Sequence, residues 1–381
     1  MKKPLLVILI TFLCISCSAC TLNNSFSDKP DEGIELTGQK PAEATPMPTP
    51  TPEPPKRAVI LAVGDIMFHS PQIKEAFNNG TYDFTSSFED IKTVIQSADV
   101  AIGNLETTVN TKRKPSGYPR FNAPAEVLDA IGSSGFDVLV TANNHSADTG
   151  EDGIISTVEN IRQRGMIAVG TGEVGKDKYA IIERNGIKFG VLAYTSSTNG
   201  LPASEEMVNI VSIEKIKGDI ELVKPMCDFL IVYIHTGTEY LREVEEDQQL
   251  LFRAVADAGA DCVLGSHPHV ARQSELYKTG EREVFINYSL GNFLSNQNDK
   301  YTDIGGMVQL SIVKHEGKVM LDGFEILPVY RLRYKDGDKT IRKVVLCSKA
   351  SDYEHISDTV KKYIEKVSME IGQLITVDNK H

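Results

Sequence analysis

Residues 59–69 read VILAVGDIMFH, an aliphatic run that ends in a glycine, an aspartate and a histidine. Such an unbroken apolar run predicts a strand that is covered on both faces, because a half-exposed strand would alternate apolar and polar residues. The polar residues behind it, Asp65 and His69, would then lie at the carboxyl end of the strand. Ligands and catalytic groups of α/β proteins gather at that end.

Similar runs recur along the chain and alternate with helical patterns. The β-rich runs lie at 100–102, 137–141, 167–169, 229–234 and 261–264, and amphipathic helices fit near 86–97, 124–134, 151–164, 213–226 and 245–258. This alternation indicates an α/β fold of βα units around a buried sheet. Two stretches, 179–194 and 284–334, interrupt it with turn signals at Asn185-Gly186 and Glu316-Gly317. They predict antiparallel hairpins, and therefore a mixed sheet or two packed sheets.

Polar residues of metal-ligand type follow several of these strands. They are Asp65 and His69, Asn104 and Glu106, Asn143-Asn144-His145, His235, and His267-Pro268-His269. Five of the eight histidines of the chain fall in these loops, which random placement would rarely produce. Alone, Asp65 could cap a helix and Asn143-Asn144 could form a turn. Together the residues predict a metal site at the strand ends.

The ligand types narrow the choice of metal. Imidazole nitrogens combined with carboxylate and amide oxygens suit Mn²⁺, Zn²⁺ or Fe better than Ca²⁺ or a thiolate-bound metal. A carboxylate that bridges two such ions about 3.5–4 Å apart would activate water and hold a phosphoryl or acyl oxygen. We expect two divalent transition-metal ions. The sequence does not determine which element they are.

The motifs around these residues resemble one known family. Gly64-Asp65, Gly103-Asn104-Leu105-Glu106, Ala142-Asn143-Asn144-His145, Gly265-Ser266-His267-Pro268-His269 and Tyr288-Ser289-Leu290-Gly291-Asn292 are similar to those of the CapA family, the poly-γ-glutamate capsule synthesis proteins. The resemblance covers about residues 58 to 300 in chain order. That family is in turn similar to the calcineurin-like metallophosphoesterases. The resemblance implies a four-layer α/β/β/α sandwich with two mixed sheets.

The resemblance also implies roles for single residues. Asp65 and His269 would bind one ion, Asn144, His235 and His267 the other, and Glu106 would bridge the two. His145 would be the general acid that protonates a leaving group.

Three further residues have two interpretations each. His69 stands four residues after Asp65, whereas metallophosphoesterases place a histidine two residues after the aspartate; it binds metal if a helical turn starts there, and otherwise supports the ligands. Arg120 could bind a substrate carboxylate or phosphate, or be a loop arginine at the surface. Glu239 could orient a ligand histidine, or be a solvated acid.

The first residues predict export and a lipid anchor. Lys2 and Lys3 precede a short apolar run that ends in Cys17-Ser18-Ala19-Cys20, so residues 1–20 read as a lipoprotein signal with Cys20 as the lipidated residue and Cys17 as the alternative. Residues 21–56 contain a dense proline tract, which predicts an extended linker. We expect a metallophosphoesterase-like domain at 57–340, a C-terminal helical segment at 341–381, and a location outside the cytoplasm at the cell membrane or surface.

Composition limits the partners. The formal net charge of −12 and the isoelectric point near 5.2 argue against nucleic acid as a partner. Two functions remain: a metal-dependent hydrolase or transferase that acts on an anionic envelope polymer or a phosphoester precursor, or a non-catalytic factor that binds the polymer through metal during assembly or export. Either could work beside membrane-bound capsule synthesis proteins. The presence of His145 favours the enzyme, because binding carboxylates needs no general acid.

Overall fold

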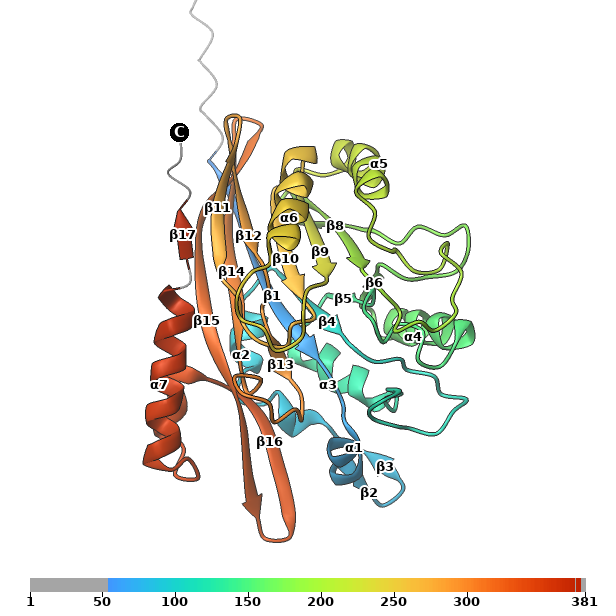
Figure 1. Cartoon of the computed structure of the whole chain (residues 1–381), viewed down its shortest axis with the longest axis vertical. Coiled ribbons are helices and arrows are strands. Elements are labelled where there is room, and N and C mark those ends of the chain that lie inside the picture. The colour runs from blue at the N-terminus through green and yellow to red at the C-terminus, as the bar shows by residue number, and fades with distance from the viewer. Residues whose placement is uncertain (1–53, 374, 378–381) are drawn as a thin grey trace, which may run out of the picture. The chain divides into compact units, whose positions relative to one another are not determined.

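Strand β1 (Lys56–Ile66) lies at the centre of the larger of two main sheets in the computed structural model (Figure 1). The strand order is β16 (Lys339–Leu346), β15 (Lys318–Asp336), β14 (Ile304–His315), β1, β4 (Val100–Leu105), β5 (Val138–Val140) and β6 (Ile167–Val169), and β13 (Asn292–Leu294) also pairs with β1. β1 is parallel to β4 and antiparallel to β14. The sheet is therefore mixed, as expected.

The second sheet is mixed as well. Its order is β17 (Ile375–Val377), β11 (Ser274–Thr279), β12 (Arg282–Asn287), β10 (Cys262–Ser266), β9 (Phe229–His235), β8 (Ile187–Thr195) and β7 (Ala180–Arg184). β9 and β10 are parallel, whereas β11 and β12 are antiparallel. A small separate ladder joins β2 (Phe77–Asn78) to β3 (Thr81–Tyr82).

The two sheets pack face to face, and helices cover their outer faces. Alternate residues of β1 point to opposite sides: Ile60 and Ala62 enter the apolar core between the sheets, while Leu61 and Val63 enter the core under the helices. Helices α1 (Ser70–Ala76), α2 (Lys92–Gln96), α3 (Glu126–Ser134) and α4 (Glu151–Gln163) contribute to that second core. Helices α5 (Ile213–Val223) and α6 (Glu246–Ala258) pack on the other sheet.

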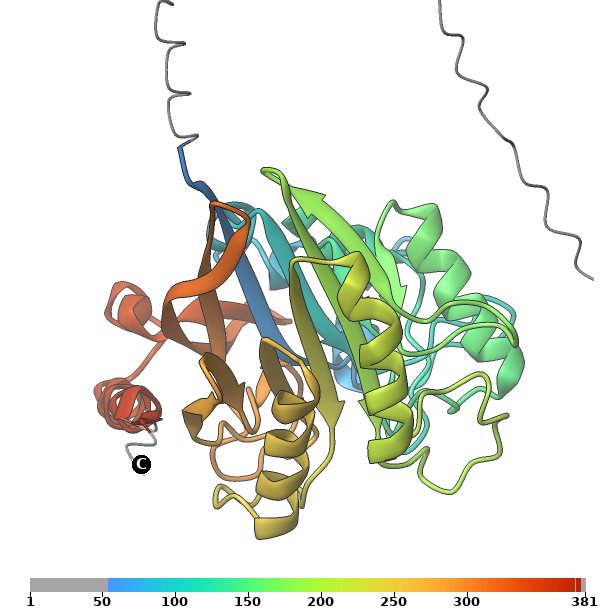
Figure 2. The same cartoon turned by 90° about the horizontal axis from the view of Figure 1, so that it is seen from above.

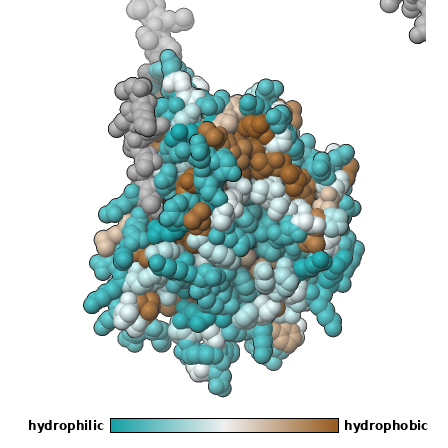
Figure 3. Space-filling model, viewed as in Figure 1, coloured by the Kyte–Doolittle hydropathy of each residue, from teal (hydrophilic) through white to brown (hydrophobic). Residues whose placement is uncertain are grey.

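This arrangement confirms the four-layer α/β/β/α sandwich. Figure 2 shows the strands between helix α4 on one side and helices α5 and α6 on the other. The expected hairpins are also confirmed: Asn185 and Gly186 connect β7 to β8, and Glu316 and Gly317 connect β14 to β15, all four with positive φ. The face shown in Figure 3 is mainly hydrophilic, with one group of apolar residues in its upper part.

One expected helix is shorter than its pattern. Residues 86–97 contain the end of the 3₁₀ turn η1 (Thr85–Ser87) and then α2, instead of one continuous helix. The β-branched residues Thr93, Val94 and Ile95 lower helix propensity, and the burial of Ile91 and Ile95 stabilises the short helix instead.

The C-terminal part packs on the larger sheet. Helix α7 (Asp358–Gln373) buries Ile364, Val367 and Ile371 against a core that includes Leu332 of β15 and Val345 of β16. Two 3₁₀ turns, η2 (Lys224–Met226) and η3 (Cys347–Asp352), complete the elements. The boundary expected between residues 340 and 341 falls inside β16, which pairs with β15 over its whole length.

The structure describes residues 54–373 and 375–377, and these described residues form one compact unit. The expected signal at 1–20 with Cys20, and nearly all of the linker expected at 21–56, lie outside the described residues. None of the helices within the described part is long and apolar enough to cross a membrane.

Candidate metal centre

Asp65 and Glu106 reach the centre from neighbouring strands of the larger sheet. In the parallel pair β1 and β4, Asp65 lies opposite Asn104, so Glu106 emerges at the same edge two residues later. The Asn104 side-chain amide donates a 2.8 Å hydrogen bond to Asp65 Oδ1. A Cβ at Gly64 would lie 1.8 Å from the carbonyl oxygen of Gly291, so the approach of these two segments requires glycine.

The second sheet brings its histidines to the same place. In the parallel pair β9 and β10, His235 lies opposite Ser266, and His267 follows directly. The buried Tyr233 hydroxyl donates a 2.9 Å hydrogen bond to the carbonyl oxygen of Val63 and joins the two sheets just before these strand ends. The site therefore lies where the carboxyl ends of both sets of parallel strands meet.

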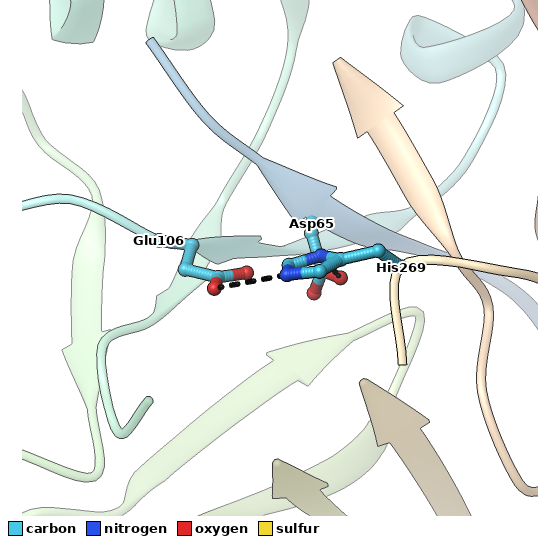
Figure 4. Close-up of side chains that lie close together, drawn as sticks. All are labelled: Asp65, Glu106 and His269. Atoms are coloured by element: carbon cyan, nitrogen blue, oxygen red, sulfur yellow. Dashed lines mark hydrogen bonds and ion pairs between the residues drawn. The ribbon is translucent and has the colours of Figure 1, made fainter. Parts of the chain in front are cut away.

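Asp65, Glu106 and His269 form a group of possible metal ligands (Figure 4). One ligand atom of each lies within 4.8 Å of the others. His269 Nδ1 is 3.0 Å from Asp65 Oδ2, and His269 Nε2 is 3.8 Å from Glu106 Oε1. One imidazole binds an ion through a single nitrogen, so the 4.8 Å limit for one ligand atom of each residue is the relevant separation; it is close to the roughly 3–4 Å between ligands of a shared ion.

The Glu106 carboxylate is fully buried, and neither of its oxygens has a hydrogen-bond partner among the described residues. Three imidazole nitrogens surround it instead: Nε2 of His235 and of His269 lie 3.8 Å from Oε1, and Nε2 of His145 lies 4.0 Å away. Burial, followed by the Asp65 carboxylate, raises the pKa of Glu106 well above its usual range. A buried carboxylate without donors is costly, so this donor set fits a shared cation.

Asn144, His235 and His267 form a second group beside the first. His235 Nε2 lies 2.9 Å from Asn144 Oδ1 and 3.1 Å from His267 Nδ1, and its Nδ1 lies 2.9 Å from the Ser266 hydroxyl. Burial, followed by His267, lowers the pKa of His235, and burial, followed by His269, lowers the pKa of His267 to about 4. Neutral imidazole is the form that binds metal. The three residues expected at the second ion thus lie together.

The backbone around Pro268 is strained. His267 and His269 have φ of 100° and 60°, a region that side-chain-bearing residues rarely adopt. The carbonyl oxygen of Pro268 accepts a 2.9 Å hydrogen bond from the Tyr240 amide, which holds the turn. Such strain is typical of functional sites, and here it directs both histidines to the centre.

His145 is held by a residue that the sequence analysis did not select. Asp148 Oδ2 lies 2.7 Å from His145 Nδ1 and also accepts a 2.5 Å hydrogen bond from the Phe121 amide. The carboxylate fixes the ring so that Nε2 points toward Glu106. The short spacing of three residues between His145 and Asp148 could have indicated this contact from the sequence. Asn104, which belongs to one of the sequence motifs but had no predicted role, likewise holds the Asp65 carboxylate.

His69 lies on the wall of the cavity and not in the cluster of Asp65, Glu106 and His269. Its Nδ1 accepts a 3.2 Å hydrogen bond from the Asn296 amide. Burial lowers the pKa of His69 to about 4, so the ring is neutral and its proton resides on Nε2. Among the described residues, no hydrogen bond or ion pair joins His69 to a candidate metal ligand.

A cavity of about 570 Å³ opens beside the centre. His145, Asn144 and His269 line it together with Arg120 and Glu239. Arg120 thus lies where it can contact a bound anion. Within residues 54–373, no hydrogen bond joins Glu239 to a histidine, so its expected part in orienting a ligand stays a prediction.

Comparisons with known proteins found one matching family model, similar sequences and similar structures. The family model described as "Bacterial capsule synthesis protein PGA_cap" matches residues 59–297. The chain is 30% identical to the capsule biosynthesis protein CapA of Bacillus anthracis, over 82% of this chain and 80% of that protein. It is 28% identical to the PGA biosynthesis protein CapA of Bacillus subtilis, over 70% of each. The structure of the calcineurin-like phosphoesterase YfkN from Bacillus subtilis aligns with a TM-score of 0.48 and 14% identity, over 84% of this chain and 99% of that one.

Proposed function

Because this chain belongs to the bacterial capsule synthesis family PGA_cap, we propose that it is a metal-dependent hydrolase or transferase that acts on an anionic envelope polymer or its phosphoester precursor. The observation that carries the proposal is the buried Glu106 carboxylate, which has three imidazoles around it and no hydrogen-bond donor in the described part of the chain. A buried glutamate that only stabilises the fold would normally accept a hydrogen bond from a neighbouring donor.

The donor set supports two ion positions. Asp65 and His269 would hold one ion, Asn144, His235 and His267 the other, and Glu106 would contact both. Divalent ions bound there would supply Lewis acidity and charge stabilisation for attack on a phosphoryl or acyl group. Mn²⁺, Zn²⁺ and Fe all suit this mixture of nitrogen and oxygen ligands.

The chain's own residues would move the proton and hold the substrate. Asp148 accepts a hydrogen bond from Nδ1–H of His145, so the imidazolium form carries its second proton on Nε2, which faces the centre. This proton can pass to the leaving group as the bond breaks. Arg120 on the cavity wall can bind a phosphate or carboxylate of the substrate through two parallel hydrogen bonds.

The proposal includes a location. The signal-like residues 1–20 with Cys20, followed by the proline-rich residues 21–56, support a lipid-anchored protein whose folded unit lies outside the cytoplasm. Membrane-bound capsule synthesis proteins would be its neighbours there. Loss of palmitate labelling in Cys20→Ala would support this anchor; labelling that persists in Cys20→Ala and is lost in Cys17→Ala would move the lipid to Cys17.

The test of the enzyme uses two histidine variants of the full chain loaded with Mn²⁺, with an aryl phosphate and γ-glutamyl amides as first substrates. His145→Ala should keep its metal and lose rate by about 10²–10⁴-fold, the usual contribution of a general acid. His267→Ala should lose metal and rate together. His315→Ala, which removes an exposed histidine of the β14–β15 hairpin, is the control and should change neither.

One outcome would favour the non-catalytic polymer-binding factor over the enzyme. If the wild-type chain binds metal but hydrolyses none of these substrates, and His145→Ala still supports capsule formation in cells, the protein is a non-catalytic factor that binds polymer through its metal. Less than half an ion per chain after incubation with Mn²⁺ or Zn²⁺ would refute both versions.

A further inference from the structure

The loop between β4 and α3 has a charge opposite to that of the whole chain. Residues 107–125 contain no aspartate or glutamate, although the chain carries a formal net charge of −12. Four cations lie in this stretch, Lys112, Arg113, Lys114 and Arg120. We call residues 112–120 the basic loop. On an acidic protein, such a local cationic segment attracts anionic partners to one part of the surface, while the rest of the surface repels them.

Most of this charge is not neutralised within the protein. Arg113 pairs with Asp152 at 3.1 Å, with both side chains about half exposed. Lys112, Lys114 and Arg120 are exposed and have no ion pair with any residue that the structure describes. Three cations of the basic loop are therefore available to a partner.

The basic loop is held in a defined shape. Asn122 is buried, and its side-chain amide donates hydrogen bonds to the carbonyl oxygens of Asn110, Arg113 and Lys114 at 3.1, 3.3 and 3.2 Å. The Ser116 hydroxyl donates a 2.7 Å hydrogen bond to the carbonyl oxygen of Arg120. A partner would meet cations whose backbone is already ordered, which lowers the entropy cost of binding.

The same loop forms part of the cavity wall. Tyr118, Pro119 and Arg120 line the cavity beside His145. The next residue, Phe121, donates its amide proton to Asp148, the carboxylate that holds His145. The cations at 112 and 114 therefore precede, along one ordered loop, the arginine that lines the cavity.

We propose that the basic loop is the docking surface for an anionic polymer with a carboxylate on each repeat, one segment of which enters the cavity beside Arg120. This inference rests on the polymer substrate of the proposed function. A single small anion would need only Arg120, whereas cations spread over residues 112–120 match charges that repeat along a chain. Attraction between the two also speeds encounter at low ionic strength.

The test measures binding of fluorescently labelled poly-γ-glutamate to the full chain, with and without Mn²⁺. The double variant Lys112→Gln/Lys114→Gln should bind about three- to tenfold more weakly at low salt, since each exposed ion pair contributes little. The difference should shrink at high salt because of screening. Metal content should be unchanged. The matched control Lys335→Gln/Lys339→Gln removes the same charge from exposed positions on the β15–β16 hairpin and should bind like the wild type.

Several results would overturn the inference. These are an equal loss of binding in the control pair, no loss in the Lys112/Lys114 pair, or a loss that persists at high salt. Binding to phosphatidylglycerol vesicles that depends on Lys112 and Lys114, while polymer binding does not, would assign the surface to lipid instead. If the chain binds polymer through the basic loop but hydrolyses nothing, the docking surface stands and only the enzyme proposal fails.

Discussion

Two buried glutamates in this protein have opposite surroundings. Glu275 of β11 is 1% exposed, and its carboxylate accepts hydrogen bonds from Arg253 Nε and Nη2 at 3.0 and 2.7 Å and from the Tyr288 hydroxyl at 2.7 Å. Glu106 is 0% exposed and accepts none from the described residues. Burial alone therefore does not identify a functional acid. The partners do: Glu275 stabilises the fold under α6, while Glu106 faces three imidazoles that do not donate to it.

The strongest test of this comparison adds metal. Mn²⁺ at about a thousand times its dissociation constant should raise the free energy of unfolding of the wild type by about 4 kcal/mol, because the ion binds only the folded chain. Glu275→Gln should show the same gain, and Glu106→Gln should lose most of it. Urea unfolding with and without Mn²⁺ measures this. An undiminished gain in Glu106→Gln would show that Glu106 does not hold the ion.

Glu275→Ala should lower the free energy of unfolding by about 2–3 kcal/mol, with or without metal. The change removes a buried carboxylate and leaves the Tyr288 hydroxyl and the Arg253 guanidinium without that acceptor. Urea unfolding in EDTA and in Mn²⁺ should give equal losses. A loss that depends on metal would contradict the separation of the two glutamates.

In EDTA, Glu106→Gln should instead raise the free energy of unfolding, by about 1 kcal/mol. The neutral amide removes a charge that the site buries next to Asp65, with no donor in the part of the chain that the structure describes. The raised pKa of Glu106 has the same cause, because the folded state disfavours the ionised form. A clear loss of stability in EDTA would mean that Glu106 supports the fold as Glu275 does.

The smallest effect is expected at His69. His69→Gln should change the dissociation constant for Mn²⁺ by less than about threefold, because Nδ1 is occupied by the Asn296 amide and the ring lies on the cavity wall. His269→Gln should weaken metal binding by at least about tenfold, as loss of a direct ligand should exceed the effect of an outer partner. Calorimetric titration separates the two. Equal losses would make His69 a ligand.

Much of the fold followed from local patterns. The aliphatic run at 59–63 became the centre of β1, and the turn residues Asn185-Gly186 and Glu316-Gly317 became hairpins with positive φ. Strand periodicity and turn chemistry act between residues that are close in sequence, so they are readable there. Helix α2 is shorter than its pattern because packing, not propensity, sets the ends of a short helix.

The residue types of the site were equally readable, because histidines, acids and an asparagine behind strands point to metal chemistry whatever the exact distances. Their partners were not. His269 meets Asp65 across 204 positions of the chain, and the Asn296 amide that occupies His69 is 227 positions away. Glu106 has no donor among the described residues while Glu275 accepts three hydrogen bonds, and this difference depends on how both sheets and α6 pack. Local sequence specifies backbone preference and ligand type, whereas hydrogen bonding between distant segments exists only after the layers have packed.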